Sequence, residues 1–340
     1  MFVLLRYVKS LKASPPRLKY YQTCFTLTIV FFLMANLTWF ETAFKETFIY
    51  SRTGRWCPRC SPKAFIDRQL INSTESYVIS KPNLCKNSEP LAFIMIISSI
   101  RSKERRDQIR ATWMKDALSV GMKVLFSLGS SVFHEDSTEI LMEDEINQDI
   151  LQFNLVDDWR NLTLKTIASL SWYKSHCSQA KYFIKVDDDA VINVDNLVTN
   201  LATFSNSHAI IGHLLKSNGP CFVWWKQRHC MPFEDHHKLN YLDYYPPYPA
   251  GPMYVLTRAA VILLVNHAKL TSRKDIYFLE DVYITLLARE IGIDLVDNPQ
   301  FLFCSQLNER NFQEKVANSI VIYDCSAKQF DSIWSLIQRN

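Results

Sequence analysis

Glycine is scarce in this chain, with only seven copies among 340 residues. No glycine belongs to a G-x-G-x-x-G turn or a G-x-x-x-x-G-K loop, the two patterns whose backbone amides most often cradle nucleotide phosphates. The chain therefore has neither a dinucleotide-binding fingerprint nor a P-loop. Any phosphate that it binds has to be held by other groups, and a metal ion bound by acidic residues is the natural substitute.

A strong net charge and internal repeats are also lacking. The formal charge is +4, and the basic residues are spread along the chain without a nucleic-acid-binding motif, so no nucleic-acid partner is expected. The apolar share of 48% and the charged share of 21% are typical of a globular protein. These values exclude a disordered or fibrous chain.

The amino terminus lacks acidic residues. Residues 20–40 are uncharged and largely apolar, and they are just long enough to cross a bilayer as a helix. Because basic residues precede this segment and Glu41 follows it, the positive-inside rule predicts a cytosolic amino terminus and a lumenal remainder. A buried core helix and a cleaved signal peptide are the alternatives. The cations that set the orientation are Arg6, Lys9, Lys12, Arg17 and Lys19.

These features predict four segments along the chain. They are a cytosolic tail at 1–19, a transmembrane signal-anchor at 20–40, a lumenal stem at 41–88 and a candidate catalytic domain at 89–340. The stem is polar and interrupted by prolines. Since the short anchor suits the thin bilayer of the early secretory pathway, we expect a single-pass type II protein of the Golgi membrane.

Cysteine usage agrees with a lumenal domain. Eight of the nine cysteines lie beyond the anchor, where an oxidising compartment allows disulfide bonds. Cys57 and Cys60 form a lone C-x-x-C, which we interpret as a stem disulfide because a zinc site needs further ligands. Sequons at Asn72 and Asn161 predict N-glycosylation on the lumenal side.

Short apolar runs alternate with amphipathic segments from Leu91 onward. This pattern is typical of strands separated by helices, and it predicts an α/β fold with a mostly parallel central sheet flanked by helices. The expected strands are 91–97, 123–128, 150–155 and 181–186, and the expected helices are 103–113, 162–175 and 282–291.

Three adjacent aspartates, Asp187, Asp188 and Asp189, follow the expected strand 181–186. Open α/β sheets usually bind their ligands at this edge. Adjacent carboxylates repel one another, and a hard divalent cation that bridges to a nucleotide diphosphate relieves this repulsion. A solvated acidic turn is the alternative interpretation.

A second acidic feature, Glu280 and Asp281, leads into the expected helix 282–291. Either carboxylate can serve as a general base, although the helix dipole alone also favours acids in a first turn. The segment 245–251, Y-P-P-Y-P-A-G, is a rigid turn with aromatic faces on which sugar rings can stack. A purely structural proline turn explains it equally well.

In this order, the motifs resemble those of the β1,3-galactosyltransferase family and its β1,3-N-acetylglucosaminyltransferase relatives. The resemblance covers about residues 91–300. It rests on R-R-x-x-I-R-x-T-W at 105–113, N-L-T-L-K-T at 161–166, K-Y-F-I-K-V-D-D-D at 181–189, Y-P-P-Y-x-x-G at 245–251 and E-D-V at 280–282. The family's type II topology also agrees with the predicted anchor.

The resemblance implies a GT-A-type nucleotide-diphospho-sugar transferase fold that binds a UDP-sugar and Mn²⁺ at the aspartate triplet. It makes Asp189 the main metal ligand, with Asp187 beside the metal and the ribose, and Asp188 supporting the loop. It brings Arg106 and Arg110 near the nucleotide, although both could instead be surface charges.

The implied reaction is an inverting transfer of a hexose to a glycan acceptor on protein or lipid, in β1,3 linkage. The general base is Asp281 or Glu280, and Tyr245, Tyr248 and Gly251 form a platform for the acceptor or the sugar. The donor is UDP-galactose or UDP-N-acetylglucosamine, with UDP-galactose preferred because the Y-P-P-Y and E-D-V forms resemble the galactosyl branch.

The sequence departs from the family pattern in two places. Met253 stands where many members have a second glycine. Many relatives also complete the metal site with a histidine near the carboxyl terminus, whereas no histidine follows His267 here. Asp324 or a water molecule could replace it as an oxygen ligand. An inactive, glycan-binding or chaperone-like protein of the same fold is the alternative to an active enzyme.

Overall fold

The computed structural model describes residues 77–131, 134–204, 208–216, 246–268, 276, 279–308 and 310–339. The predicted tail and anchor and most of the predicted stem lie outside these residues, as do Asn72 and Tyr245. Within the described ranges, no helix is both long and apolar enough to cross a membrane.

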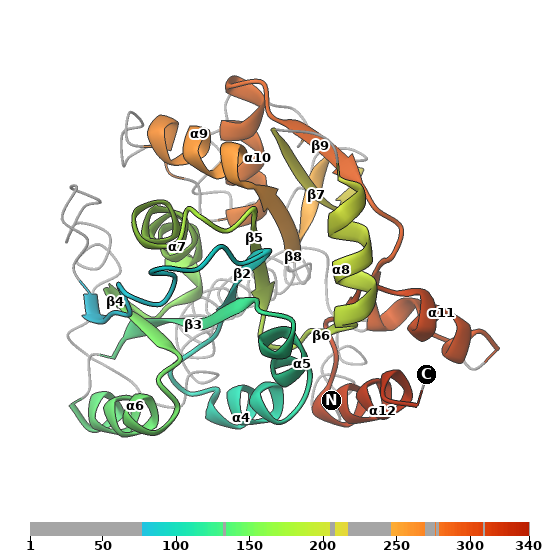
Figure 1. Cartoon of the computed structure of the whole chain (residues 1–340), viewed down its shortest axis with the longest axis horizontal. Coiled ribbons are helices and arrows are strands. Elements are labelled where there is room, and N and C mark those ends of the chain that lie inside the picture. Colours follow the sequence, from blue (N-terminus) through green and yellow to red (C-terminus); the bar gives the residue numbers. More distant parts are fainter. Residues whose placement is uncertain are drawn as a thin grey trace, which may run out of the picture. The chain divides into compact units, whose positions relative to one another are not determined.

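The main sheet of the described chain has eight strands in the order β1-β4-β3-β2-β5-β8-β7-β9 (Figure 1). The expected strands all occur, with bounds shifted by one or two residues at their ends. The strands are β1 Tyr77–Ile79, β2 Ala92–Ile97, β3 Lys123–Ser130, β4 Ile150–Val156, β5 Tyr182–Asp187, β7 Ala209–Leu215, β8 Tyr248–Thr257 and β9 Asp294–Asp297.

The sheet is mostly parallel, as expected, since six of its eight strands run in one direction and β1 and β8 run the opposite way. Its centre, from β4 through β3 and β2 to β5, is parallel. Beyond β5 the chain inserts β8 antiparallel to both β5 and β7, while β7 and β9 pair in parallel. Consecutive parallel strands are joined by a crossover, which is usually a helix, whereas antiparallel strands need none. The segment between β7 and β8 has no helical periodicity, so the expected alternation of strands and helices did not locate these two strands.

Two apolar cores lie on the two faces of this sheet. In β2, Ile94 and Ile96 enter one core while Phe93 and Met95 enter the other, as the twofold periodicity of a strand requires. Helices α4, α5 and α8 cover the first face, and α7, α9 and α10 cover the second (Figure 1). A strand buried on both faces reads as a continuous apolar run, which is why the pattern located the central strands.

The described helices agree with the expected ones except that the first is broken. The expected helix 103–113 divides at Thr112, whose backbone leaves the helical region at φ −120° and ψ −126°. The helices are α4 Lys103–Ala111, α5 Trp113–Ser119, α6 His134–Asn147, α7 Leu162–His176, α8 Val194–Thr203, α9 Arg258–Ala268, α10 Glu280–Glu290, α11 Phe312–Asn318 and α12 Ala327–Ile337.

A second, smaller sheet places the carboxyl-terminal part of the chain beside the carboxyl end of β5. Its strands, in spatial order, are β10 Phe301–Phe303, β11 Val321–Tyr323 and β6 Val191–Ile192. Because β6 follows the aspartate triplet directly and pairs with β11, the residues just after β11 lie beside the triplet.

Residues 77–88 belong to the packed domain, although their polarity assigned them to the stem. The strand β1 pairs with β4, and Cys85 is buried in a disulfide with Cys177, 92 residues away. Neither contact requires an apolar repeat in the segment itself. The folded domain therefore begins no later than Tyr77.

Candidate active site

The site forms where β5 ends. Odd-numbered residues of β5 face the layer of α7, α9 and α10, so that Phe183, Lys185 and Asp187 follow one another on this face. Tyr254 of β8 is the direct cross-strand neighbour of Lys185. The side chains of Lys185 and Asp187 therefore lie on the face of the sheet that α10 covers.

Lys185 is almost fully buried, with 1% of its surface exposed, and its ammonium group contacts three different segments. It donates to Oδ1 of Asp187 at 2.6 Å and to the backbone carbonyl of Gly251. Oε2 of Glu280 lies 3.9 Å away. Burial alone would lower the pKa of Lys185, but the charges of Asp187 and Glu280 outweigh it and raise this pKa. The lysine is therefore charged at neutral pH.

The two acids at the start of α10 have different surroundings. Glu280 is 3% exposed, and it accepts a short hydrogen bond from the hydroxyl of Tyr254. Asp281 is only half-buried, and its Oδ1 accepts from the backbone N–H of Val282 at 2.9 Å. Burial raises the pKa of both carboxyl groups, that of Asp281 to about 6. Of the two acids at the start of α10, Asp281 is the one that combines partial exposure with a pKa near neutrality, the properties of a general base.

Gly251 is adjacent to Asp281 as well as to Lys185. A Cβ atom added to Gly251 would lie 3.0 Å from Oδ2 of Asp281, which is closer than ordinary van der Waals contact. The absence of a side chain at this position therefore allows the carboxylate to approach the backbone of β8. Gly251 was predicted as part of a sugar platform, and the structure brings it beside the candidate base.

Asp188 belongs to a network that joins β5 to the loop after β2. Its Oδ2 accepts from the hydroxyl of Ser98 at 2.7 Å. Arg106 reaches the same loop, where it donates to Ser98 Oγ at 3.3 Å and to the carbonyl of Ser99. The loop is also bound by Lys165, which donates to the carbonyl of Ser98 at 2.9 Å.

Arg106 and Arg110 serve these internal networks. Arg106 has no exposed surface and forms an ion pair with Glu143 at 2.6 Å. Arg110 pairs with Asp149 at 2.8 Å and with Glu143 at 2.7 Å. Their guanidinium groups are occupied by carboxylates of α6 and of the turn before β4, so the structure does not place them for a direct nucleotide contact.

Asp189 lies next to the loop that follows β11. The backbone N–H of Cys325 donates to its carbonyl at 3.3 Å. Burial is the largest cause of a rise that brings the pKa of Asp189 to about 6, and the charges of Asp187 and Asp188 and, less strongly, of Asp324, the residue before Cys325, add to this rise. The structure thus brings together two predicted metal ligands that lie far apart in the sequence.

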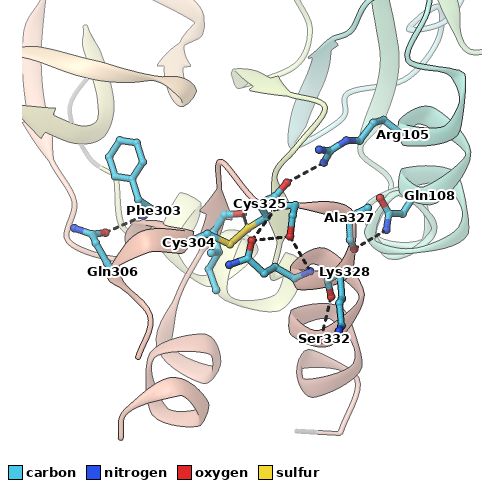
Figure 2. Close-up of a disulfide and its surroundings, with 12 residues drawn as sticks. Arg105, Gln108, Phe303, Cys304, Gln306, Cys325, Ala327, Lys328 and Ser332 are labelled. Carbon is cyan, nitrogen blue, oxygen red and sulfur yellow. Dashed lines mark hydrogen bonds between the residues drawn. A yellow bond between two sulfur atoms is a disulfide. The ribbon is translucent and has the colours of Figure 1, made fainter. Parts of the chain in front are cut away.

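The loop after β11 is held on both sides (Figure 2). Cys325 forms a disulfide with Cys304, 21 residues earlier, and its carbonyl accepts from Arg105 of α4 at 3.0 Å. Asp324 adopts a left-handed backbone conformation with φ +61°, which aspartate tolerates better than most residues. The disulfide and Arg105 therefore fix the position of Asp324 relative to α4.

The residues present fit a metal ion whose coordination is completed by a bound substrate and water. Oδ1 of Asp189 is buried and has no hydrogen-bond partner among the described residues, as expected for an oxygen that binds a cation. No group of three or more histidine, cysteine or acidic side chains in the described ranges is arranged around a common metal position. Magnesium-like cations are often held by one or two carboxylates together with substrate phosphates and water.

Three further residues that the sequence singled out, Met253, Tyr248 and Asn161, also lie in the described part of the chain. Met253 is fully buried in the core opposite Val186, so its side chain does not line an open site. Tyr248 is half-buried at the start of β8, where it packs against the second core. Its predicted partner Tyr245 lies outside the described residues. The side-chain amide of Asn161 donates to the carbonyl of Val156, and its sequon's Thr163 is buried, which does not favour a glycan there.

Sequence-based reasoning missed Lys185, Ser98 and Arg105. Lys185 had a signal, because a lysine inside a continuous apolar strand requires a buried partner, and the residue two positions later is Asp187. Ser98 and Arg105 had none, since their partners lie 90 and 220 residues away. Only the folded chain reveals those contacts.

Comparison with known proteins defines the class. The family model described as Galactosyltransferase matches residues 104–299. Beta-1,3-galactosyltransferase 1 of Homo sapiens is 28% identical over 268 residues, which cover 76% of this chain and 77% of that protein. Lactosylceramide 1,3-N-acetyl-beta-D-glucosaminyltransferase B of Danio rerio is 28% identical over 247 residues, which cover 68% of this chain and 62% of that protein. The solved WbbM bifunctional glycosyltransferase aligns with a TM-score of 0.42 and 9% identity, covering 74% of this chain and 50% of that one.

The matched segment extends from α4 to the residues after β9, and it includes the aspartate triplet and the acid pair. It spans more than half of the chain. The chain therefore belongs to the galactosyltransferase family, as the order of its motifs suggested.

Proposed function

We propose that the protein is an inverting, metal-dependent glycosyltransferase of GT-A type that moves galactose or N-acetylglucosamine from a UDP-sugar to a glycan hydroxyl in β1,3 linkage. The observation that carries this proposal is the convergence of Asp187, Asp189 and Asp281 at the end of β5, in a chain of the galactosyltransferase family. The first two come from the triplet and the third comes from α10.

On the donor side, Asp189 and Asp324 are the residues that would hold Mn²⁺. When bound, the cation neutralises charge on the diphosphate as UDP departs. Asp187 is fixed by Lys185 and faces the same edge of the sheet, where its carboxylate can accept a hydrogen bond from the UDP-sugar. Asp188 is already bound to Ser98, so we assign it to holding the loop.

On the acceptor side, Asp281 is the general base. The acceptor hydroxyl oxygen attacks C1 of the donor sugar, its proton moves to the carboxylate of Asp281, and the bond between C1 and the UDP oxygen breaks with its electron pair leaving on UDP. Attack on the face opposite the leaving group inverts the configuration at C1. One oxygen of Glu280 accepts a hydrogen bond from Tyr254, and the other lies 3.9 Å from the ammonium group of Lys185. We therefore assign Glu280 to supporting the site.

The identity of the donor stays open between two sugars. A relative named for galactose transfer and a relative named for N-acetylglucosamine transfer are each 28% identical to this chain. We prefer UDP-galactose because of the Y-P-P-Y and E-D-V motifs. The uncharged segment 20–40 and the cations before it support a Golgi type II anchor with the catalytic domain in the lumen.

Calorimetry of UDP binding tests the donor side. The protein should bind UDP much more tightly with Mn²⁺ than with a chelator, and Asp189→Asn should reduce the manganese-dependent affinity by about tenfold or more. Asp195→Asn is the matched control, because Asp195 is an exposed aspartate in the first turn of α8. Unchanged manganese-dependent binding in Asp189→Asn would move the metal away from the triplet.

A further inference from the structure

Three parts of the site meet at one buried ammonium group. Lys185 binds Asp187 of the aspartate triplet and the carbonyl of Gly251 in β8, and it lies 3.9 Å from Glu280 at the start of α10. It also lies 5.9 Å from the ring centre of Tyr254, the residue that donates to Glu280. Among the described residues, this lysine joins all three segments.

Burying an ammonium group is costly, and it is tolerated only where fixed partners compensate. Lys185 has two carboxylates and one carbonyl as partners, and the side chain of Asp187, the nearer carboxylate, is only 31% exposed. The carbonyl of Gly251 accepts a hydrogen bond from a further N–H of the ammonium group, and it belongs to a third segment, β8. The geometry around Lys185 is that of a clamp that fixes three segments relative to one another.

The clamp extends to the candidate base. Lys185 holds the carbonyl of Gly251, and Asp281 lies so close to the same glycine that a methyl group on its α-carbon would be 3.0 Å from Oδ2. Lys185 also faces Glu280, the residue directly before Asp281 in α10. A movement of the ammonium group would therefore be transmitted to Asp281 through the backbone of β8 and through α10.

We propose that Lys185 is a positioning residue that fixes the separation between the donor-side carboxylate Asp187 and the base Asp281. The role rests on the proposed function, because that function gives the separation a catalytic meaning. In the proposed reaction, Lys185 itself contacts neither the acceptor hydroxyl oxygen nor C1 of the donor sugar. It acts by holding Asp187 and the Gly251 backbone at a constant distance, so that the acceptor hydroxyl lies in line with C1 of the donor.

The test uses Lys185→Met, which keeps most of the length of the side chain and removes its charge, together with Lys185→Met/Glu280→Gln. The single variant leaves Glu280 buried without its cation, so it should unfold at a temperature lower by roughly 10 °C. The double variant removes that uncompensated carboxyl group and should regain much of the loss. Lys81→Met is the matched control, because Lys81 pairs with Asp144 at 2.6 Å outside the site.

Activity separates positioning from stability. We expect kcat to fall about 10²-fold in Lys185→Met and to stay low in the double variant despite its recovered melting temperature. The control Lys81→Met should lose stability with unchanged kcat. Recovery of kcat together with stability in the double variant, or near-normal kcat in Lys185→Met, would show that Lys185 only stabilises the fold and would overturn the proposal.

A crystal structure of the double variant without ligands gives a readout that does not depend on turnover. The separation of the Asp187 and Asp281 carboxylates should change by about 1 Å or more relative to the wild-type protein. An unchanged separation would overturn the proposal even if the enzyme is active. A changed separation, together with a wild-type protein that transfers no sugar, would instead uphold the clamp and reject the proposed function.

Discussion

Glu280 and Asp281 are neighbours in the sequence, yet their environments assign them different tasks. Glu280 faces inward to Tyr254 and Lys185, whereas Asp281 is half-exposed beside Gly251. The sequence could not decide between them, because both positions of a first helical turn accept acids. The choice follows from the rotation of α10 on the sheet, which turns one side chain to the core and the next to the site.

The first prediction concerns this pair. Asp281→Asn should lower kcat by about 10²-fold or more while UDP and Mn²⁺ binding stay nearly unchanged, because a base acts on the acceptor. Glu280→Gln should mainly lower the melting temperature, since it leaves Lys185 with one carboxylate fewer. Steady-state kinetics at saturating donor, with calorimetry for binding, separates the two effects. A larger loss of kcat in Glu280→Gln than in Asp281→Asn would reverse the assignment.

The second prediction is a pH dependence. The raised pKa of Asp281, about 6, means that its carboxyl group takes up a proton as the pH falls through 6 and then cannot accept one from the acceptor. The value of kcat/KM for the acceptor should therefore be nearly constant above about pH 7, about half of this plateau at pH 6 and about tenfold below the plateau at pH 5. A profile measured with manganese and donor at saturation checks this. A flat profile down to pH 5 would exclude a base with the pKa of Asp281.

At the scale of elements, the loop after β11 is the part that the sequence located least well. Asp324 was proposed as a metal ligand only because the expected histidine was missing. Its position beside Asp189 depends on the pairing of β6 with β11 and on the disulfide of Cys304 with Cys325, and neither can be derived from local periodicity. By contrast, β2 and β5 were predictable because both of their faces are apolar.

The third prediction follows from that disulfide. Cys304→Ser/Cys325→Ser opens a loop of 21 residues and should lower the free energy of unfolding by about 3 kcal/mol. It should also weaken manganese-dependent UDP binding, since Asp324 is no longer fixed. Denaturant unfolding and calorimetry measure the two effects.

The other described disulfide provides the control. Cys85 pairs with Cys177, which follows α7 and precedes the start of β5, at the edge of the sheet opposite the site. Cys85→Ser/Cys177→Ser should therefore lose stability and keep its UDP affinity. Equal losses of affinity in both double variants would mean that the binding defect reflects general loosening, and Asp324 would lose its assigned role.

The arginines of α4 show that neighbouring residues of one motif can have different partners. Arg106 and Arg110 were predicted near the nucleotide, yet each is bound by carboxylates from α6 or from the turn before β4. The neighbouring Arg105 instead points to the loop after β11. One helical residue is a rotation of about 100°, so the adjacent arginines Arg105 and Arg106 point to different sides of α4.

For the whole molecule, the α/β class, the central strands and the ends of the strands as the location of the site were all accessible from the pattern of apolar runs. The mixed character of the sheet and the start of the folded domain were not, because β1, β8 and the Cys85 disulfide depend on contacts with distant residues. The predicted anchor and the sequon at Asn72 lie outside the described residues and remain predictions.

The central claim is that this chain transfers a sugar with Mn²⁺ at the aspartate triplet and Asp281 as the base. The most direct measurement incubates the full-length protein in detergent with a panel of UDP-sugars and a glycan array, with Asp281→Asn as the matched inactive variant. We predict a β1,3-linked product from UDP-galactose or UDP-N-acetylglucosamine, abolished by a chelator, restored by Mn²⁺ and reduced about 10²-fold in the variant. Tight manganese-dependent UDP binding without transfer from any donor to any glycan would contradict the claim and favour an inactive, glycan-binding member of the family.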